Sequence, residues 1–169
     1  MRVARHLVLV ALLALGFAST AHAAVEVQFV EPDGYTDSNL YGGYGGKASE
    51  PALRQIKSYL ERLGERYLKP NQRLDIAVLD VDLAGRYEPW HRFGYDVRIL
   101  RGVTWPRITL RYSLRENGTV LASAEETVAD LAYLMRPSVR HSSETLRYEK
   151  AMLRSWFRAR FAELRPPAA

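Results

Sequence analysis

The longest apolar segment after the N-terminal region reads LDIAVLDVDLAG and covers residues 74–85. On an extended strand, one face would carry Leu74, Ile76 and Val78, and the other Ala77, Leu79, Val81 and Leu83. Apolar residues on both faces predict a central strand with protein packed on each side. The loops, a partner chain or a second copy of the chain could then cover the second face.

Two amphipathic helices are predicted on either side of this strand in the sequence. The first, which ends before Lys69-Pro70, has apolar residues at steps of three and four, the spacing of one helix face. They are Leu53, Ile56, Leu60, Leu63 and Tyr67. The second begins at Ser142 or Ser143 and runs to about Leu164. Its stripe is Leu146, Leu153, Phe157, Phe161 and Leu164.

The remaining strands are indicated by alternation of apolar and polar residues. This pattern occurs at 25–30 and 108–114, and residues 97–100 could form a short strand. Asn117-Gly118 is a strong hairpin signal, so 120–126 should return as the partner of 108–114. The pattern predicts one α+β domain over residues 24–169. Its single mixed, mostly antiparallel sheet would have four to five strands, with two main helices packed on one face.

The first 23 residues have the layout of a secretory signal peptide. Arg2 and Arg5 precede the apolar run at 7–15, and Ala21-His22-Ala23 offers a small-residue cleavage site. The run is too short to span a bilayer, which needs about 20 residues. We therefore expect cleavage after Ala23, a periplasmic protein and no transmembrane segment in the mature chain.

Composition narrows the functional classes. There is no cysteine, so an exported domain must be stable without disulfides. The formal charge of +5 includes Arg2 and Arg5, and without them it falls to +3. This excess is too small to indicate a nucleic-acid-binding protein.

Several segments resemble one known family. They are residues 74–90, 101–114 and 148–157, together with Tyr35-Thr36-Asp37. In these the chain is similar to the bacterial domain of unknown function 3016 family, and the similarity extends over nearly all of residues 24–169. The resemblance implies an exported protein of proteobacterial type with no assigned activity, and the family supplies no catalytic residues to carry over. The element order is also similar to small envelope proteins that act in outer-membrane assembly or as accessory subunits.

Most catalytic and metal chemistries lack their residues. His91 and His141 are the only histidines after the signal, and four Cys/His ligands are typical of structural zinc. No G-x-S-x-G, G-x-x-x-x-G-K-[ST] or G-x-G-x-x-G motif occurs. We therefore assign no catalytic residue, metal or cofactor.

Asp80 and Asp82 are the most interesting polar residues. Two positions apart on a strand they share a face, and two adjacent carboxylates can retain a proton near neutral pH. With Arg86 and Trp90 they could form a ligand site or an acid–base pair. The simpler interpretation is that they mark where the strand emerges into solvent, or that they pair with Arg86, Arg98 or Arg111. Asp75 is expected on the opposite face.

A basic row on the second helix, Lys150, Arg154 and Arg158, could contact phosphate groups of lipid or lipopolysaccharide. An ordinary solvated helix face explains it more simply. The favoured interpretation is a binding or accessory module of the cell envelope, whose partner is another envelope protein or a second copy. The alternative is a small hydrolase-like periplasmic enzyme that uses the Asp80 and Asp82 carboxylates.

Overall fold

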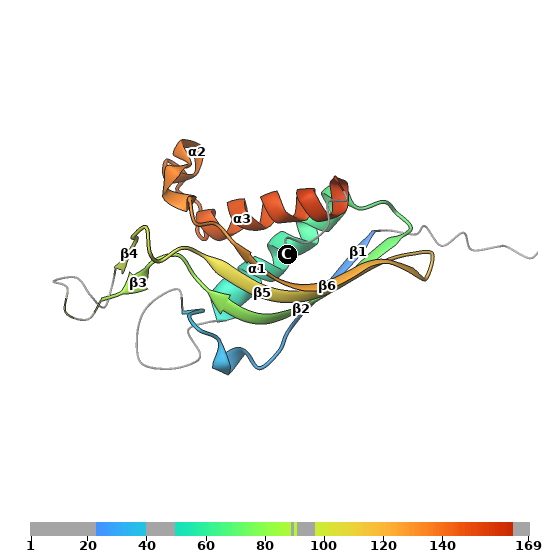
Figure 1. Cartoon of the computed structure of the whole chain (residues 1–169), viewed down its shortest axis with the longest axis horizontal. Coiled ribbons are helices and arrows are strands. Elements are labelled where there is room, and N and C mark those ends of the chain that lie inside the picture. Colours follow the sequence, from blue (N-terminus) through green and yellow to red (C-terminus); the bar gives the residue numbers. More distant parts are fainter. Residues whose placement is uncertain (1–22, 40–49, 89, 91–96, 164–169) are drawn as a thin grey trace, which may run out of the picture.

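The computed structural model describes residues 23–39, 50–88, 90 and 97–163. In them, a four-stranded sheet of order β1-β2-β5-β6 has two long helices on one face (Figure 1). Strands β1 and β2 are parallel, and the other neighbours are antiparallel. The strands are β1 Ala24–Phe29, β2 Gln72–Asp82, β5 Arg107–Glu116 and β6 Thr119–Ala129. The predicted α+β fold is confirmed.

The signal-peptide prediction concerns residues 1–23, of which 1–22 lie outside the described part.

Strand β2 does not present apolar side chains to both faces as predicted. Its register against β5 shifts between Val78 and Asp80, which makes Leu79 the extra residue of a β-bulge. An extra residue inverts the alternation of side chains along a strand. Val81 and Leu83 therefore join the same buried cluster as the apolar residues of the first half of β2. The expectation of a second apolar face was wrong.

Helix α1 (Glu50–Tyr67) connects the parallel strands β1 and β2, and it buries the predicted stripe except for Tyr67, which is partly buried. Helix α3 (Arg147–Phe157) continues into a π-helical turn at Arg158–Ala162. Its predicted start at Ser142 or Ser143 was wrong. Leu146 adopts a left-handed backbone with φ of 56°, which a right-handed helix cannot include. Leu164, the expected end, lies outside the described residues.

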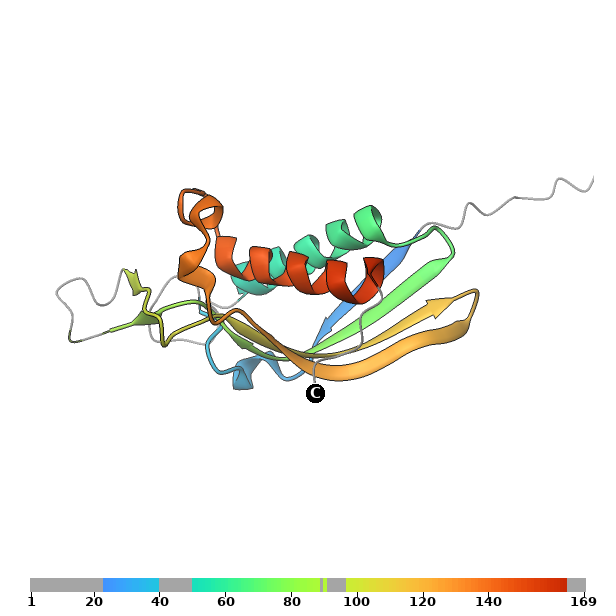
Figure 2. The ribbon, with the colours of Figure 1, turned by 45° about the horizontal axis from the view of Figure 1, so that its top comes forward.

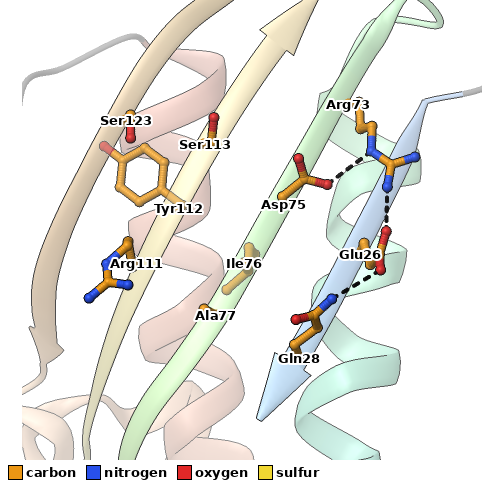
Figure 3. Close-up of a pocket in the computed structure, with 10 residues that line it drawn as sticks. All are labelled: Glu26, Gln28, Arg73, Asp75, Ile76, Ala77, Arg111, Tyr112, Ser113 and Ser123. Carbon is orange, nitrogen blue, oxygen red and sulfur yellow. Dashed lines mark hydrogen bonds and ion pairs between the residues drawn. The ribbon is translucent and has the colours of Figure 1, made fainter. Parts of the chain in front are cut away.

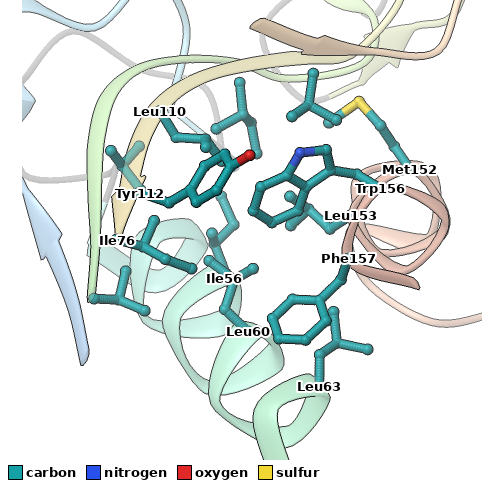
Figure 4. Close-up of a cluster of buried hydrophobic side chains, with 14 of the residues drawn as sticks. Ile56, Leu60, Leu63, Ile76, Leu110, Tyr112, Met152, Leu153, Trp156 and Phe157 are labelled. Atoms are coloured by element: carbon teal, nitrogen blue, oxygen red, sulfur yellow. The ribbon is translucent and has the colours of Figure 1, made fainter. Parts of the chain in front are cut away.

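The core lies between the two helices and the inner face of the sheet (Figure 4). Leu60 of α1, Leu114 of β5 and Leu153 of α3 are completely buried. The aromatic rings of α3 pack edge-on, with ring centroids 6.0 Å apart for Trp156 and Phe157. Apolar burial of this extent stabilises the fold without disulfides.

A smaller group of elements lies at the end of the sheet away from the β5–β6 hairpin (Figure 2). They are the two-stranded ladder of β3 (Arg86–Tyr87) and β4 (Arg98–Ile99), the short helix α2 (Pro137–Arg140) and the 3-10 turn η3 (Tyr133–Met135). A second 3-10 turn, η1 (Pro32–Gly34), follows β1. A second small core at this end contains Ala84, Tyr133, Val139, Tyr148 and Ala151. These elements position most of the polar residues singled out in the sequence.

Candidate functional site

The Asp80 and Asp82 carboxylates lie on the outer face of the sheet, opposite the helices. Asp80 pairs with Thr109 in the ladder, and Asp82 pairs with Arg107. The Asp80 carboxylate accepts hydrogen bonds from the backbone N–H and the hydroxyl of Thr36, at 2.7 and 2.8 Å. It therefore fixes the segment that follows β1. Asp75 is on this outer face as well, contrary to expectation, because the bulge changes the face of the later residues.

Asp82 is engaged by different partners. Its side chain is 5% exposed, accepts a hydrogen bond from Arg86 at 2.5 Å and forms an ion pair with Arg107 at 2.8 Å. Arg86 also contacts Asp37 at 2.9 Å. Trp90 is 82% exposed. Asp82 is therefore paired with arginines, whereas Asp80 is bound by Thr36. Because each carboxylate has its own set of donors, the geometry gives no support to a proton-sharing pair in a hydrolase.

Arg98 organises this end of the molecule; it was expected only as one possible partner of Asp80 and Asp82, and it contacts Asp37 instead. Its guanidinium donates to the Asp37 carboxylate at 2.8 Å and to the backbone oxygens of Leu83, Ala84, Gly85 and Asn39. It also lies 5.1 Å from the centroid of the Tyr87 ring. A planar group with five donors suits such a junction. The signal available in the sequence was an arginine in a short strand near an Asp-containing loop.

Tyr35 attaches the same segment to β2. Its hydroxyl donates a hydrogen bond to the backbone oxygen of Val78 at 2.8 Å. Burial raises the pKa of Tyr35 to about 12, so the hydroxyl stays protonated and remains a donor. The residues Tyr35, Thr36 and Asp37, which the resemblance singled out, thus each bind a different part of the β2 end. Their role in the described structure is to order this end of the sheet.

Glu149 is a buried acid that the sequence analysis assigned no role. It is 3% exposed, and its carboxylate accepts a hydrogen bond from the Ala84 backbone N–H at 2.8 Å. Burial raises the pKa of Glu149. It lines a hollow of about 280 Å³ with Arg98 and Arg147 at the start of α3. Its position on the stripe between Leu146 and Leu153 was the signal that could have revealed its burial.

The other notable feature is the open outer face of the sheet. Helices α1 and α3 both lie on the inner face, and the outer face is hollowed into a pocket of about 400 Å³ (Figure 3). Small residues from three strands, Ala77, Ser113 and Ser123, line it. Charged side chains stand around them and include Glu26, Arg73, Asp75 and Arg111. The face is polar rather than apolar, as expected for the solvated side of a sheet.

The charges on this outer face are paired with one another. Arg73 contacts both Glu26 and Asp75, the latter at 2.9 Å. Asp75 also contacts Arg115 at 2.8 Å. Arg111 contacts Glu125 at 2.8 Å across the β5–β6 pair. The pocket is therefore surrounded by both charge signs in nearly equal number.

Two negative findings apply to the described residues alone. They contain no cluster of three or more His, Cys, Asp or Glu side chains with the geometry of a metal site. None of their helices is long and apolar enough to cross a membrane.

Comparison with known proteins identifies the family. A family model described as "Protein of unknown function (DUF3016)" matches residues 23–159. The chain belongs to the DUF3016 family. No curated protein matches this DUF3016 chain. A crystal structure of a Xanthomonas campestris protein of the family DUF330 matches at 15% identity. That match covers 85% of the DUF3016 chain and 81% of the other protein, with a TM-score of 0.30.

Proposed function

We propose that the protein is an exported, periplasmic binding module of the cell envelope that holds another envelope protein against the open outer face of its sheet. The observation that carries this proposal is the hollowed face opposite the two helices. Export is supported by the signal-peptide layout of residues 1–23. It is also supported by the start of β1, since the strand begins at Ala24, immediately after the expected cleavage site.

The size of this face suits a protein partner. Strands β2 and β5 have 11 and 10 residues, which correspond to roughly 35 Å of length. Four strands at about 4.8 Å spacing then present on the order of 600 Å². A standard protein interface takes about 800 Å² from each partner, so the face supplies most of one interface.

The charge pattern also favours a protein over a charged polymer. Arg73, Arg111 and Arg115 alternate with Glu26, Asp75 and Glu125, and each arginine contacts at least one of these acids. A uniformly anionic polymer would meet as many carboxylates as cations. A protein surface that carries charges of both signs can form new ion pairs with these residues. One of its side chains can also fill the hollow above Ala77, Ser113 and Ser123.

Site-directed photocrosslinking in the producing cell tests this proposal. A photoreactive amino acid at Ser123, on the floor of the pocket, should give a protein adduct of defined mass. The same amino acid at Ser138, an exposed serine of α2, should not. Ser123→Trp should abolish adduct formation from a neighbouring outer-face position such as Thr127, whereas Ser138→Trp should leave it unchanged.

The outcomes separate the alternatives. An adduct whose mass is twice that of the chain would identify a second copy as the occupant and would overturn the hetero-partner proposal. The absence of an adduct at Ser123, or adducts of equal yield at Ser123 and Ser138, would also overturn it.

A further inference from the structure

Another hollow lies on the helical side of the molecule, away from the open sheet face. Its volume is about 380 Å³, and it is lined by one side of α1 and by a residue of α3. The lining residues are Pro51, Arg54, Gln55, Ser58, Arg62 and Lys150. Three of the six are cationic, and two of the others carry neutral hydrogen-bond donors. Among the residues that the structure describes, no acidic side chain lines the hollow.

Lys150 is the unusual member of this set. The sequence analysis favoured placing it in a solvated row with Arg154 and Arg158, and that was wrong. Lys150 is 8% exposed, whereas Arg154 and Arg158 are exposed. Its amine contacts the Glu144 carboxylate at 2.8 Å and the Gln55 amide oxygen at 3.5 Å. A buried ammonium is costly unless it is well paired, and its one carboxylate partner is itself 56% exposed.

The arginines of α1 add further positive charge at the rim of this hollow. Arg54 forms an exposed ion pair with Glu50 at 2.8 Å. The Arg62 guanidinium lies 5.5 Å from the centroid of the Tyr59 ring and, among the described residues, has no carboxylate within ion-pair distance. Within the described part of the chain, the three cations of the hollow therefore exceed the carboxylates that contact them by one. An anion bound there would neutralise the excess.

We propose that this hollow binds a phosphate group, either that of an anionic lipid headgroup or that of a soluble phosphate compound. Guanidinium groups bind phosphate oxygens with paired donors, and an ammonium adds a point charge. Ser58 and Gln55 supply neutral donors between them. These groups come from two helices, α1 and α3, on either side of the hollow. This site is independent of the proposed protein-binding sheet face, which lies on the opposite side of the sheet.

Two binding arms distinguish the sources of the phosphate. The purified protein is mixed with phosphatidylcholine vesicles with or without phosphatidylglycerol and is assayed by flotation. In parallel it is titrated with inorganic phosphate and with glycerol phosphate by calorimetry. Binding in the vesicle arm alone identifies a lipid headgroup, and binding in the titration identifies a soluble compound. No binding in either arm would overturn the proposal.

A matched pair of arginine variants tests the location of the site. Arg62→Gln should weaken binding by about tenfold or more, as expected for loss of a charged hydrogen bond. Arg66→Gln removes the same charge one turn later on α1, from an arginine that lies 5.4 Å from the Tyr67 ring and outside the hollow. Its binding should stay within about twofold of wild type. Equal losses in both variants would indicate general electrostatic attraction and would overturn the assignment.

Discussion

At the scale of single residues, Asp82 is the polar group whose loss should cost most at the β2 end. Asp82→Asn removes the negative charge that holds Arg86 and Arg107. Because these arginines are 38% and 44% exposed, solvent screens part of the loss. We expect the free energy of unfolding, measured by urea titration, to fall by about 1–3 kcal/mol.

Asp80→Asn is the matched control for this prediction. Asp80 is bound by the backbone and hydroxyl of Thr36 rather than by arginine, and an asparagine oxygen can still accept the backbone hydrogen bond. Its cost should be less than about 1 kcal/mol. If Asp80→Asn were the more destabilising of the two, the ion-pair account of this end of the sheet would be wrong.

Glu149 predicts a pH dependence of stability. Burial raises its pKa above the ordinary value of 4.5, so between that value and the folded-state pKa the native chain binds more protons than the unfolded chain. The contribution of Glu149 to the free energy of unfolding therefore decreases as pH rises through this window. Glu149→Gln keeps an acceptor for the Ala84 N–H but cannot ionise. Relative to wild type, the variant should gain stability as pH increases.

Urea unfolding of both proteins between about pH 4 and pH 8 measures this difference. Glu65→Gln, at an exposed position of α1, controls for the general effect of removing one negative charge. A gap between Glu149→Gln and wild type that stayed constant with pH, or that moved in parallel with the Glu65→Gln gap, would refute the assignment of a raised pKa.

At the scale of elements, Gly64 sets how closely α1 approaches β1. A Cβ atom at this position would lie 2.0 Å from the Val25 Cγ2 atom, a distance at which side chains overlap. Gly64→Ala should therefore lower the free energy of unfolding by about 1–3 kcal/mol. This is opposite to the gain of about 1 kcal/mol that alanine brings to an unconstrained helix position.

A double-mutant cycle with Val25→Ala tests the cause. Removing the Val25 methyl groups opens the space that the new Cβ needs. Val25→Ala should therefore cost less in the Gly64→Ala background than in wild type. Additive losses in the cycle, measured by urea unfolding, would show that helix and strand do not interact through this contact.

The elements were largely predictable, and the exception has a clear cause. The hairpin at Asn117-Gly118 forms as expected, with both residues at positive φ. The strand at 72–82 was recognised by its apolar residues. Its bulge could not be recognised, because the residues around it are apolar at every second or third position, and this pattern does not show where an extra residue is inserted. The face of Val81 was therefore misassigned. Bulges depend on the register with a partner strand, which local pattern does not contain.

The candidate site was harder to predict than the fold. The pairing of Asp82 with Arg86, four positions away, was among the alternatives considered, whereas its pairing with Arg107 across the ladder was not. The contact of Asp37 with Arg98 joins residues 61 positions apart, so it cannot be predicted from the periodicity of a local segment. Lys150 was placed on a solvated helix face, and Glu149 was given no role, because charged residues seldom lie within a buried stripe. Each contacts a partner from another segment, Lys150 the Gln55 amide oxygen and Glu149 the Ala84 backbone N–H.

At the scale of the whole molecule, the proposed function depends on export. We expect osmotic shock of the producing bacterium to release the chain, and we expect its intact mass to match a polypeptide whose first residue is Ala24. Ala23→Arg should block cleavage, because the position before the scissile bond requires a small residue, and the precursor should accumulate. His22→Phe changes the unconstrained middle position of the same A-x-A site and should be processed normally. An unprocessed wild-type chain, or one confined to the cytosolic fraction, would contradict the proposed location in the cell envelope. The proposed phosphate site on α1 does not depend on export and would still be tested by its own experiment.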